Sequence, residues 1–170
     1  YLARSLDRGA NFNVINIPFS AGESPLFISP YVVSQTEPGF IYAGGVYVYR
    51  SVDGGDNWSP TNSGGPLNGD PVFAMDVFDQ NHTIVYAATL GISNRSTVFV
   101  TTSAGDSWSS SNAGLPNRVP NDIEIDPNNP SIAYICFSGF GGGHLYKTMD
   151  FGQNWELIDN GLPDVPGNAV

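Results

Sequence analysis

Basic residues are scarce in this chain of 170 residues, which has one lysine, Lys147, five arginines and a formal net charge of −10 at pH 7. Proteins that bind nucleic acid need basic side chains to pair with phosphates, so a nucleic acid partner is not expected. The single cysteine, Cys136, excludes an intrachain disulfide. It lies in the apolar run 132–137, which predicts a buried and unreactive thiol.

Other signals are missing as well. No apolar run approaches the roughly twenty residues of a membrane-spanning helix, so no membrane span is expected. His82 and His144 are far apart in sequence and lack the spacing of metal ligands, and the glycine-rich stretch 139–143 has no lysine for phosphate binding. The sequence therefore predicts neither a metal nor a cofactor, and it predicts a flexible connection at 139–143.

The composition instead favours short strands joined by many turns. The chain has 20 glycines and 13 prolines, and 41% of its residues are hydrophobic. Glycine and proline interrupt long elements and favour turns, so long helices are not expected.

One octet of residues recurs four times and organises the chain. It has Ser or Thr at position one, Asp at three in all copies but the third, Gly at five and an aromatic residue at eight. The first residues of successive copies are 46, 50 and 47 positions apart. Each octet follows an apolar run and precedes another extended segment, which predicts a turn between two strands. The four copies are Ser5-x-Asp7-x-Gly9-x-x-Phe12, Ser51-x-Asp53-x-Gly55-x-x-Trp58, Thr101-x-Ser103-x-Gly105-x-x-Trp108 and Thr148-x-Asp150-x-Gly152-x-x-Trp155.

Each complete repeat contains four short extended segments. In one repeat they lie at about 72–78, 83–89, 96–101 and 108–112, and in the next at 120–126, 131–137, 144–148 and 155–159. A four-stranded sheet repeated every 40–50 residues is typical of a β-propeller. The sequence thus predicts one all-β domain over 1–170, with a half blade at 1–17, blades at about 30–62, 72–112 and 120–159, and the start of another blade at 167–170.

Three blades and a half do not close a ring of the usual four to eight blades. The chain also opens inside a strand-like segment, residues 1–5. We therefore expect an excerpt of a larger propeller whose remaining strands come from further chain, or alternatively from self-association.

The octet resembles the Asp-box, or BNR repeat, of sialidase-like propellers, which also occurs in xyloglucanase-type glycoside hydrolases, sortilin-type receptors and photosystem assembly factors. The resemblance covers nearly the whole chain. It implies that Asp7, Asp53 and Asp150 stabilise turns and take no part in catalysis. Ser103 departs from the pattern, so its turn should be held less firmly unless Asp106 compensates. The arginine cluster expected of a sialidase is not found on the innermost segments.

Two acidic residues are weak candidates for catalysis. Asp76 and Glu124 occupy equivalent positions on the innermost segments of neighbouring blades, and paired carboxyl groups hydrolyse glycosides when suitably spaced. Acids that merely solvate the central channel explain the same pattern, because Asp122 and Asp126 extend it at the spacing of a strand face.

Residues that break the repeat are the better candidates for binding. They lie in loops expected on the face opposite the octets, where aromatic side chains beside acids and an arginine can recognise a glycan or a protein. These residues are Phe19, Glu23, Phe27, Arg95 and Phe140.

Three sequons, at Asn57, Asn81 and Asn94, permit N-glycosylation in a secreted protein. With the composition and the resemblance, they predict an extracellular or periplasmic location. The sequence as a whole predicts a non-catalytic scaffold or recognition module that binds a glycan or a protein. The alternatives are a portion of a xyloglucanase-type glycoside hydrolase and a structural subunit of a fibre or surface layer.

Overall fold

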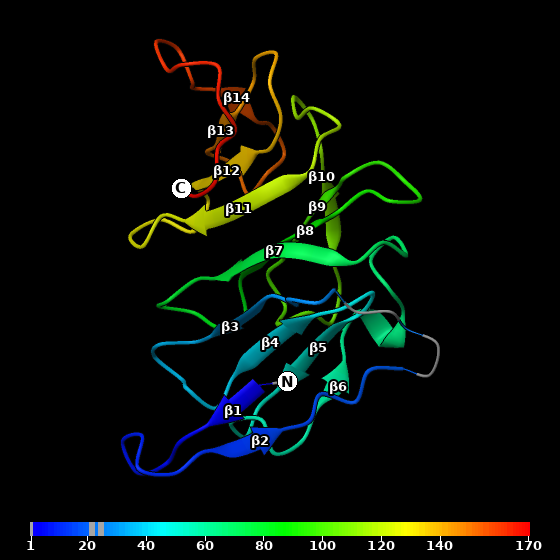
Figure 1. Ribbon diagram of the computed structural model, residues 1–170, viewed down its shortest axis with the longest axis vertical. Coiled ribbons are helices and arrows are strands. Elements are labelled where there is room, and N and C mark those ends of the chain that lie inside the picture. The colour runs from blue at the N-terminus through cyan, green and yellow to red at the C-terminus, as the bar shows by residue number, and fades with distance from the viewer. Residues whose placement is uncertain (1, 21–22, 24–25) are drawn as a thin grey trace.

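The computed structural model describes residues 2–20, 23 and 26–170, which form four antiparallel sheets stacked one above another (Figure 1). A two-stranded ribbon contains β1 (Leu2–Arg4) and β2 (Asn13–Ile15). The next sheet contains β3 (Tyr31–Val33), β4 (Ile41–Gly44), β5 (Val48–Ser51) and β6 (Ser59–Pro60). A 3-10 turn, η1 (Asn62–Gly64), follows it.

The other two sheets repeat this order of four strands. One contains β7 (Val72–Val77), β8 (Val85–Thr89), β9 (Val98–Thr101) and β10 (Ser109–Ser111). The other contains β11 (Pro120–Ile125), β12 (Ala133–Phe137), β13 (Leu145–Thr148) and β14 (Glu156–Leu157). Each strand pairs with the next in sequence, so every sheet is a meander. The expected all-β class and partial propeller are confirmed, and we call the three larger sheets blades one to three.

Apolar side chains between the blades form the core. Successive side chains of a strand point to opposite faces of the sheet, so every second residue of a blade's first strand faces the preceding blade. Met75 and Val77 pack against blade one in this way. Ile123 and Ile125 pack against blade two. Tyr42 of β4 is fully buried between blades one and two. A single sheet exposes two faces, so each blade depends on its neighbours to cover both.

Polar contacts between blades also repeat. The Tyr42 hydroxyl donates to the His82 carbonyl oxygen of the next blade at 2.8 Å, and the Tyr86 hydroxyl donates to that of Pro130 at 3.0 Å. The Trp108 and Trp155 indoles donate to hydroxyl groups of the preceding blade, those of Thr61 and Ser111. Trp58 donates instead to its own Gly55 carbonyl, because the equivalent of Thr61 is the apolar Ile15.

Two arginines that precede octets bridge neighbouring sheets. Arg4 of β1 forms an ion pair with Asp56 of the second octet at 2.6 Å, and Arg50 of β5 pairs with Asp106 of the third octet at 3.2 Å. Each guanidinium also donates to an octet carbonyl oxygen. Asp106 therefore does not compensate for Ser103 in its own turn, since its carboxylate faces Arg50.

Hydrogen bonds within each octet explain its residue pattern. The Ser51 hydroxyl accepts the Gly55 N–H at 2.8 Å, and the Asp53 carboxylate accepts both the backbone and side-chain N–H groups of Asn57, at 2.9 and 2.7 Å. These bonds lower the pKa of Asp53 to about 2. Gly55 has a φ of 97°, a conformation that glycine adopts without strain.

The third octet has a weaker version of this network. Ser103 replaces the aspartate, and Ser107 replaces the asparagine that the other three octets carry at position seven. The Ser107 N–H donates to the Ser103 hydroxyl at 3.2 Å, and no carboxylate oxygen is present to accept a second bond.

Residues 167–170, expected to begin a further blade, belong to no strand in the structure. The Gly167 N–H donates to the Phe137 carbonyl oxygen at 3.1 Å, and the Val170 N–H donates to the Asp122 carboxylate at 3.1 Å. This segment therefore lies against β11 and β12.

Introducing the aspartate and the asparagine that the other octets carry at positions three and seven should stabilise the third octet. We expect Ser103→Asp with Ser107→Asn to raise the free energy of unfolding by about 1 kcal/mol, because the new carboxylate accepts two N–H groups at a solvated site. Ser103→Asp alone should give a smaller gain. Urea denaturation of the three proteins measures this difference, and a double variant no more stable than the single one would contradict the role given to asparagine.

Candidate functional site

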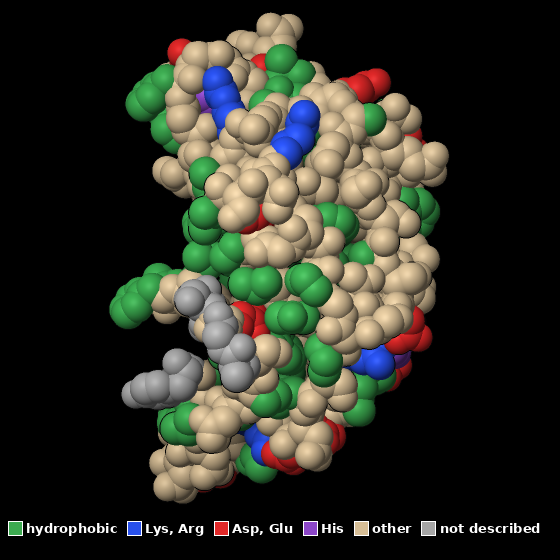
Figure 2. Space-filling view, turned by 90° about the vertical axis from the view of Figure 1, so that its right-hand side faces the viewer, with side chains coloured by type: hydrophobic (Ala, Val, Ile, Leu, Met, Phe, Trp, Pro, Cys, Tyr) green, Lys and Arg blue, Asp and Glu red, His purple; other side chains and the backbone are tan. Residues whose placement is uncertain are grey.

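The loops opposite the octets form one face of the molecule, which we call the loop face (Figure 2). It consists of the connections between second and third strands and the connections between successive blades. Hydrophobic side chains gather along its hollowed side in Figure 2. Among the described residues, six large hydrophobic side chains are more than 60% exposed. Four belong to this face, namely Phe27, Ile28, Ile92 and Phe140, and two, Leu6 and Phe12, belong to the first octet.

Glu23, a predicted binding residue, is occupied by contacts within the protein. Its carboxylate accepts the Tyr49 hydroxyl at 2.7 Å and the N–H groups of Val46 and Tyr47, which form the turn between β4 and β5. Phe19 packs edge-on against Tyr49, with ring centroids 5.6 Å apart. These two residues therefore attach the loop before β3 to blade one.

Phe27 is fully exposed beside the attached segment. It lines a groove of about 410 Å³ together with Phe19, Leu26 and Ile28. A hydrophobic groove with an aromatic residue on its rim suits contact with apolar groups of a ligand. Phe27 thus keeps the surface position that binding requires.

Arg95 and Phe140 lie on the loops of blades two and three. The Arg95 guanidinium donates to the Leu115 carbonyl oxygen, so it joins two loops of the face. The loop that carries Phe140 is held by Arg118, which donates to the Phe140 carbonyl oxygen at 2.9 Å and to that of Gly142 at 2.7 Å. Arg118 therefore fixes the backbone while the Phe140 ring projects to solvent, a role the sequence alone did not indicate.

The acidic candidates line a separate small pocket at the inner strands. Asp76, Asp79 and Glu124 surround a volume of about 170 Å³, with Gln35 from the loop after β3. The Asp76 carboxylate accepts the Val77 N–H and the Ile125 N–H, each at 2.8 Å, so it ties β7 to β11. Ligand pockets commonly measure about 300–1,000 Å³, so this pocket is small for a sugar ring.

The environment of Asp76 favours its protonated form. Burial is the main cause that raises the pKa of Asp76 to about 7; the N–H of Ile125 opposes this shift, and the negative charge of Glu124 adds to it. Burial also raises the pKa of Glu124, with Asp122 adding repulsion. Two neighbouring carboxyl groups with raised pKa values have the chemistry of an acid–base pair, but both oxygens of Asp76 are already bonded to the backbone.

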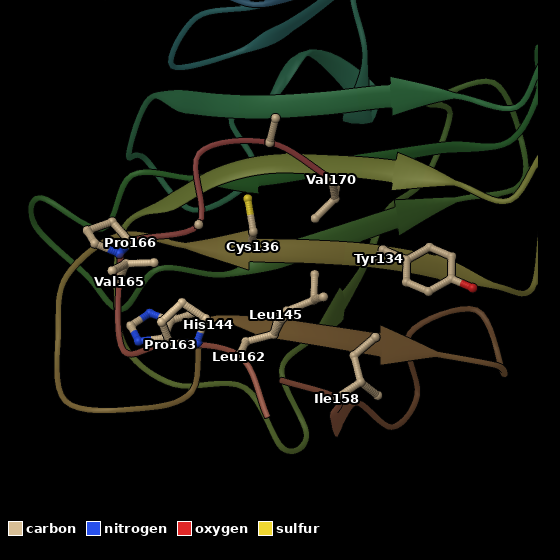
Figure 3. Close-up of a pocket in the computed structure, with 12 residues that line it drawn as sticks. Tyr134, Cys136, His144, Leu145, Ile158, Leu162, Pro163, Val165, Pro166 and Val170 are labelled. Atoms are coloured by element: carbon tan, nitrogen blue, oxygen red, sulfur yellow. The ribbon is translucent and has the colours of Figure 1, made fainter. Parts of the chain in front are cut away.

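An apolar cavity of about 410 Å³ lies against blade three (Figure 3). Tyr134, Cys136 and Leu145 form its floor, and the segment after β14 passes over it. By repeat spacing these residues match Tyr86, Ala88 and Val98, which are buried between blades two and three. The cavity is therefore best understood as part of a blade-packing surface.

Burial at this surface makes Cys136 unreactive, since it raises the thiol pKa to about 11. His144 lies beside it, and its Nε2 atom is 2.7 Å from the Asp164 carboxylate. That hydrogen bond is the main cause that lowers the Asp164 pKa. No group of three His, Cys, Asp or Glu side chains suited to a metal ion occurs in the part of the chain that the structure describes.

The three sequon asparagines are exposed, but each already makes local hydrogen bonds. The Asn57 side chain donates to Asp53 within its octet, and the Asn94 side chain donates to the Asn68 carbonyl oxygen. The Asn81 side chain accepts the N–H and hydroxyl groups of Thr83. Glycosylation at these sites stays a prediction.

Comparisons with solved structures support the fold. The chain superposes on an ancestral GH74 enzyme with a TM-score of 0.68 and 17% identity, covering 92% of this chain and 21% of that one. For the GH74 xyloglucanase from Xanthomonas campestris the TM-score is 0.62, with 14% identity and coverages of 79% and 23%. YCF48 from Cyanidioschyzon merolae gives 0.56, with 20% identity and coverages of 82% and 45%.

These neighbours are β-propellers, and at such low identity they establish the propeller fold alone. The chain spans about a fifth of the length of the GH74 proteins and less than half of YCF48. No protein-family model and no curated protein matches the sequence. Across the described residues, no helix is both long and apolar enough to span a membrane.

The titration of Asp76 tests the electrostatics of the acidic pocket. Its side-chain carbon resonance should titrate with a midpoint near pH 7, and Glu124→Gln should lower that midpoint because it removes a repelling charge. The folded-state pKa exceeds the unfolded value of about 3.9, so this group's contribution to stability is full below pH 4 and is lost as pH rises toward 7. A midpoint near 4 in the folded protein would show that Asp76 is well solvated.

Proposed function

We propose that this chain is an Asp-box propeller module that recognises a protein partner through its loop face and does not catalyse a reaction. The observation that supports this proposal is the group of exposed hydrophobic residues on that face, Phe27, Ile28, Ile92 and Phe140. Hydrophobic and aromatic side chains on loops held by a rigid scaffold are typical of binding surfaces. The in-turn bonding of the octets supports the Asp-box assignment, since their acids hold turns on the opposite face.

A protein segment suits this face better than a glycan. Glycan binding requires polar groups beside an aromatic ring, whereas the groove at Phe27 is lined mainly by apolar side chains, including Leu26 and Ile28. The nearby acid, Glu23, and the basic residue Arg95 already bond to the protein itself. One structural neighbour, YCF48, was solved bound to a D1 peptide, which is consistent with peptide recognition on this fold.

We further propose that the protein is exported to an extracellular or periplasmic space. The three exposed sequon asparagines and the scarcity of lysine support this location. Mass measurement of the protein expressed with a eukaryotic secretion signal would detect glycans at Asn57, Asn81 or Asn94.

Paired surface variants test the recognition surface. We expect Phe27→Ser with Phe140→Ser to weaken capture from a library of displayed peptides by at least about tenfold, because two exposed aromatic anchors are removed. Leu6→Ser with Phe12→Ser is the matched control on the octet face, and it should leave capture unchanged. Equal losses in both double variants, or binding to a glycan array that depends on Phe27 and Phe140, would contradict the proposed protein partner.

A second candidate function is favoured by the raised pKa of Asp76. A carboxyl group that is protonated near neutral pH beside Glu124, on a fold shared with GH74 enzymes, is compatible with glycoside hydrolysis. Under this alternative the chain releases reducing sugar from xyloglucan, and Asp76→Asn or Glu124→Gln lowers the release by about a hundredfold or more. The recognition proposal predicts no release by the unmodified chain.

A further inference from the structure

Asparagine followed by glycine occurs twice in this chain, at Asn68-Gly69 and at Asn160-Gly161. This dipeptide is prone to deamidation, because glycine has no Cβ to shield its backbone nitrogen from the asparagine side chain. The reaction needs an asparagine side chain that can rotate toward that nitrogen, and it needs access for water. The two dipeptides differ in both respects.

Asn68 is held in place by its side chain. Its amide nitrogen donates to the Thr89 hydroxyl at 3.0 Å, and its amide oxygen accepts the Asp70 N–H at 3.1 Å. Thr89 and Asp70 are both buried. The Asn68 side chain must break both bonds before its carbonyl carbon can approach the Gly69 nitrogen, so the fold protects this dipeptide.

Asn160 lies in a turn after β14. The Leu162 N–H closes this turn by donating to the Asp159 carbonyl oxygen at 2.9 Å. The Asn160 side chain is exposed, and it forms no hydrogen bond with any residue that the structure describes. It is therefore free to rotate and open to water.

The repeat shows that exposure is a property of this position. Ser63 and Ala113 take the place of Asn160 in blades one and two, and both are exposed although another blade follows each of them. In each case the next residue is a glycine with a positive φ, which is 91° at Gly114 and 87° at Gly161. The turn therefore requires the glycine, but it does not require an asparagine before it.

The segment that contains Asn160 also holds the loop between β12 and β13, which carries Phe140. The Asp159 carboxylate accepts two N–H groups from the end of that loop, at 3.0 and 3.1 Å. The Asp164 carboxylate accepts two more from its middle, at 2.9 and 3.2 Å, and lies 2.7 Å from Nε2 of His144. The four N–H groups belong to Gly141, Gly142, Gly143 and His144.

We propose that Asn160 is a site of spontaneous deamidation, and that its conversion to isoaspartate loosens the loop that carries Phe140. The Gly161 backbone nitrogen attacks the Asn160 side-chain carbonyl carbon and loses its proton, and the side-chain amide leaves as ammonia. The product is a cyclic imide, which water opens at one of its two carbonyl groups. One opening gives aspartate. The other gives isoaspartate, in which the backbone runs through the former side chain.

Isoaspartate changes the spacing of the two carboxylates that hold the loop. It adds one carbon atom to the backbone between residues 160 and 161, which lie between Asp159 and Asp164. The carboxylates then no longer match the positions of the loop N–H groups. Water is the only co-reactant, and the proposal does not depend on recognition by the loop face.

Timed incubation of the folded 170-residue protein in mildly alkaline buffer tests the site. Tandem mass spectrometry of its peptides locates each converted asparagine, and an isoaspartyl methyltransferase labels the isoaspartate product. We expect Asn160 to convert at least about tenfold faster than Asn68, because Asn68 must first break two hydrogen bonds. In concentrated urea the two rates should become similar, since the same dipeptide then reacts without the fold.

Two variants test the effect on the loop by hydrogen exchange. We expect the amides of residues 141–144 to exchange at least about threefold faster in the isoaspartate form, separated by ion-exchange chromatography, than in fresh protein. Asn160→Ala copies Ala113 and cannot deamidate, so incubation should leave its exchange unchanged. Freshly purified Asn160→Asp carries the new charge without the longer backbone, and it should exchange like the fresh protein.

Similar conversion rates of Asn160 and Asn68 in the folded protein would overturn the assignment of the site. An intact Asn160 in folded protein, under conditions that convert it in urea after dilution to the same pH, would do the same. Unchanged exchange at 141–144 in the isoaspartate form would overturn the effect on the loop. Equally fast exchange in Asn160→Asp would show that charge, and not the longer backbone, loosens it, which also contradicts the proposal.

Discussion

The structure depends on the packing of each blade against its neighbours, because a four-stranded sheet cannot cover its own two faces. Between blades two and three this packing combines a continuous apolar cluster with the bond from Tyr86 to Pro130. The same geometry recurs between blades one and two through Tyr42. Where a neighbouring strand is not in place, as beside Val33, the same surface is left open to solvent. The open surfaces of this molecule therefore follow from its repeat as much as its core does.

The octets show how one turn serves two levels of structure. Within the turn, Asp53 is saturated by Asn57 and Ser51, which accounts for its low pKa without any functional role. Between sheets, the same loop offers Asp56 and a carbonyl oxygen to Arg4. The residue at position six of an octet therefore contacts the neighbouring sheet, while the residue at position three stabilises the turn itself. This division explains why Asp106 pairs with Arg50 even though its own octet has Ser103 in place of the aspartate at position three.

The repeat made the fold predictable from the sequence, since the recurring octets and the extended segments between them indicate four strands per repeat and their order. Side-chain partners were less accessible. Glu23 breaks the repeat and was expected to bind a ligand, yet its carboxylate holds the Val46–Tyr47 turn. That contact joins residues more than twenty positions apart, and no local pattern encodes it. The asparagine at position seven was detectable, because it recurs in three octets together with the aspartate it bonds.

A residue that breaks the repeat is thus not free for function by that fact alone. Arg118 and Glu23 both fall outside the repeat pattern, and both form hydrogen bonds with the backbone of a loop. Both residues lie close to an exposed aromatic side chain. Arg118 holds the loop from which Phe140 projects, and Glu23 belongs to the segment that precedes Phe27. A rigid loop loses less conformational entropy on binding than a mobile one. Under the proposed recognition function, Glu23 and Arg118 therefore contribute indirectly, by holding the loops that carry Phe27 and Phe140.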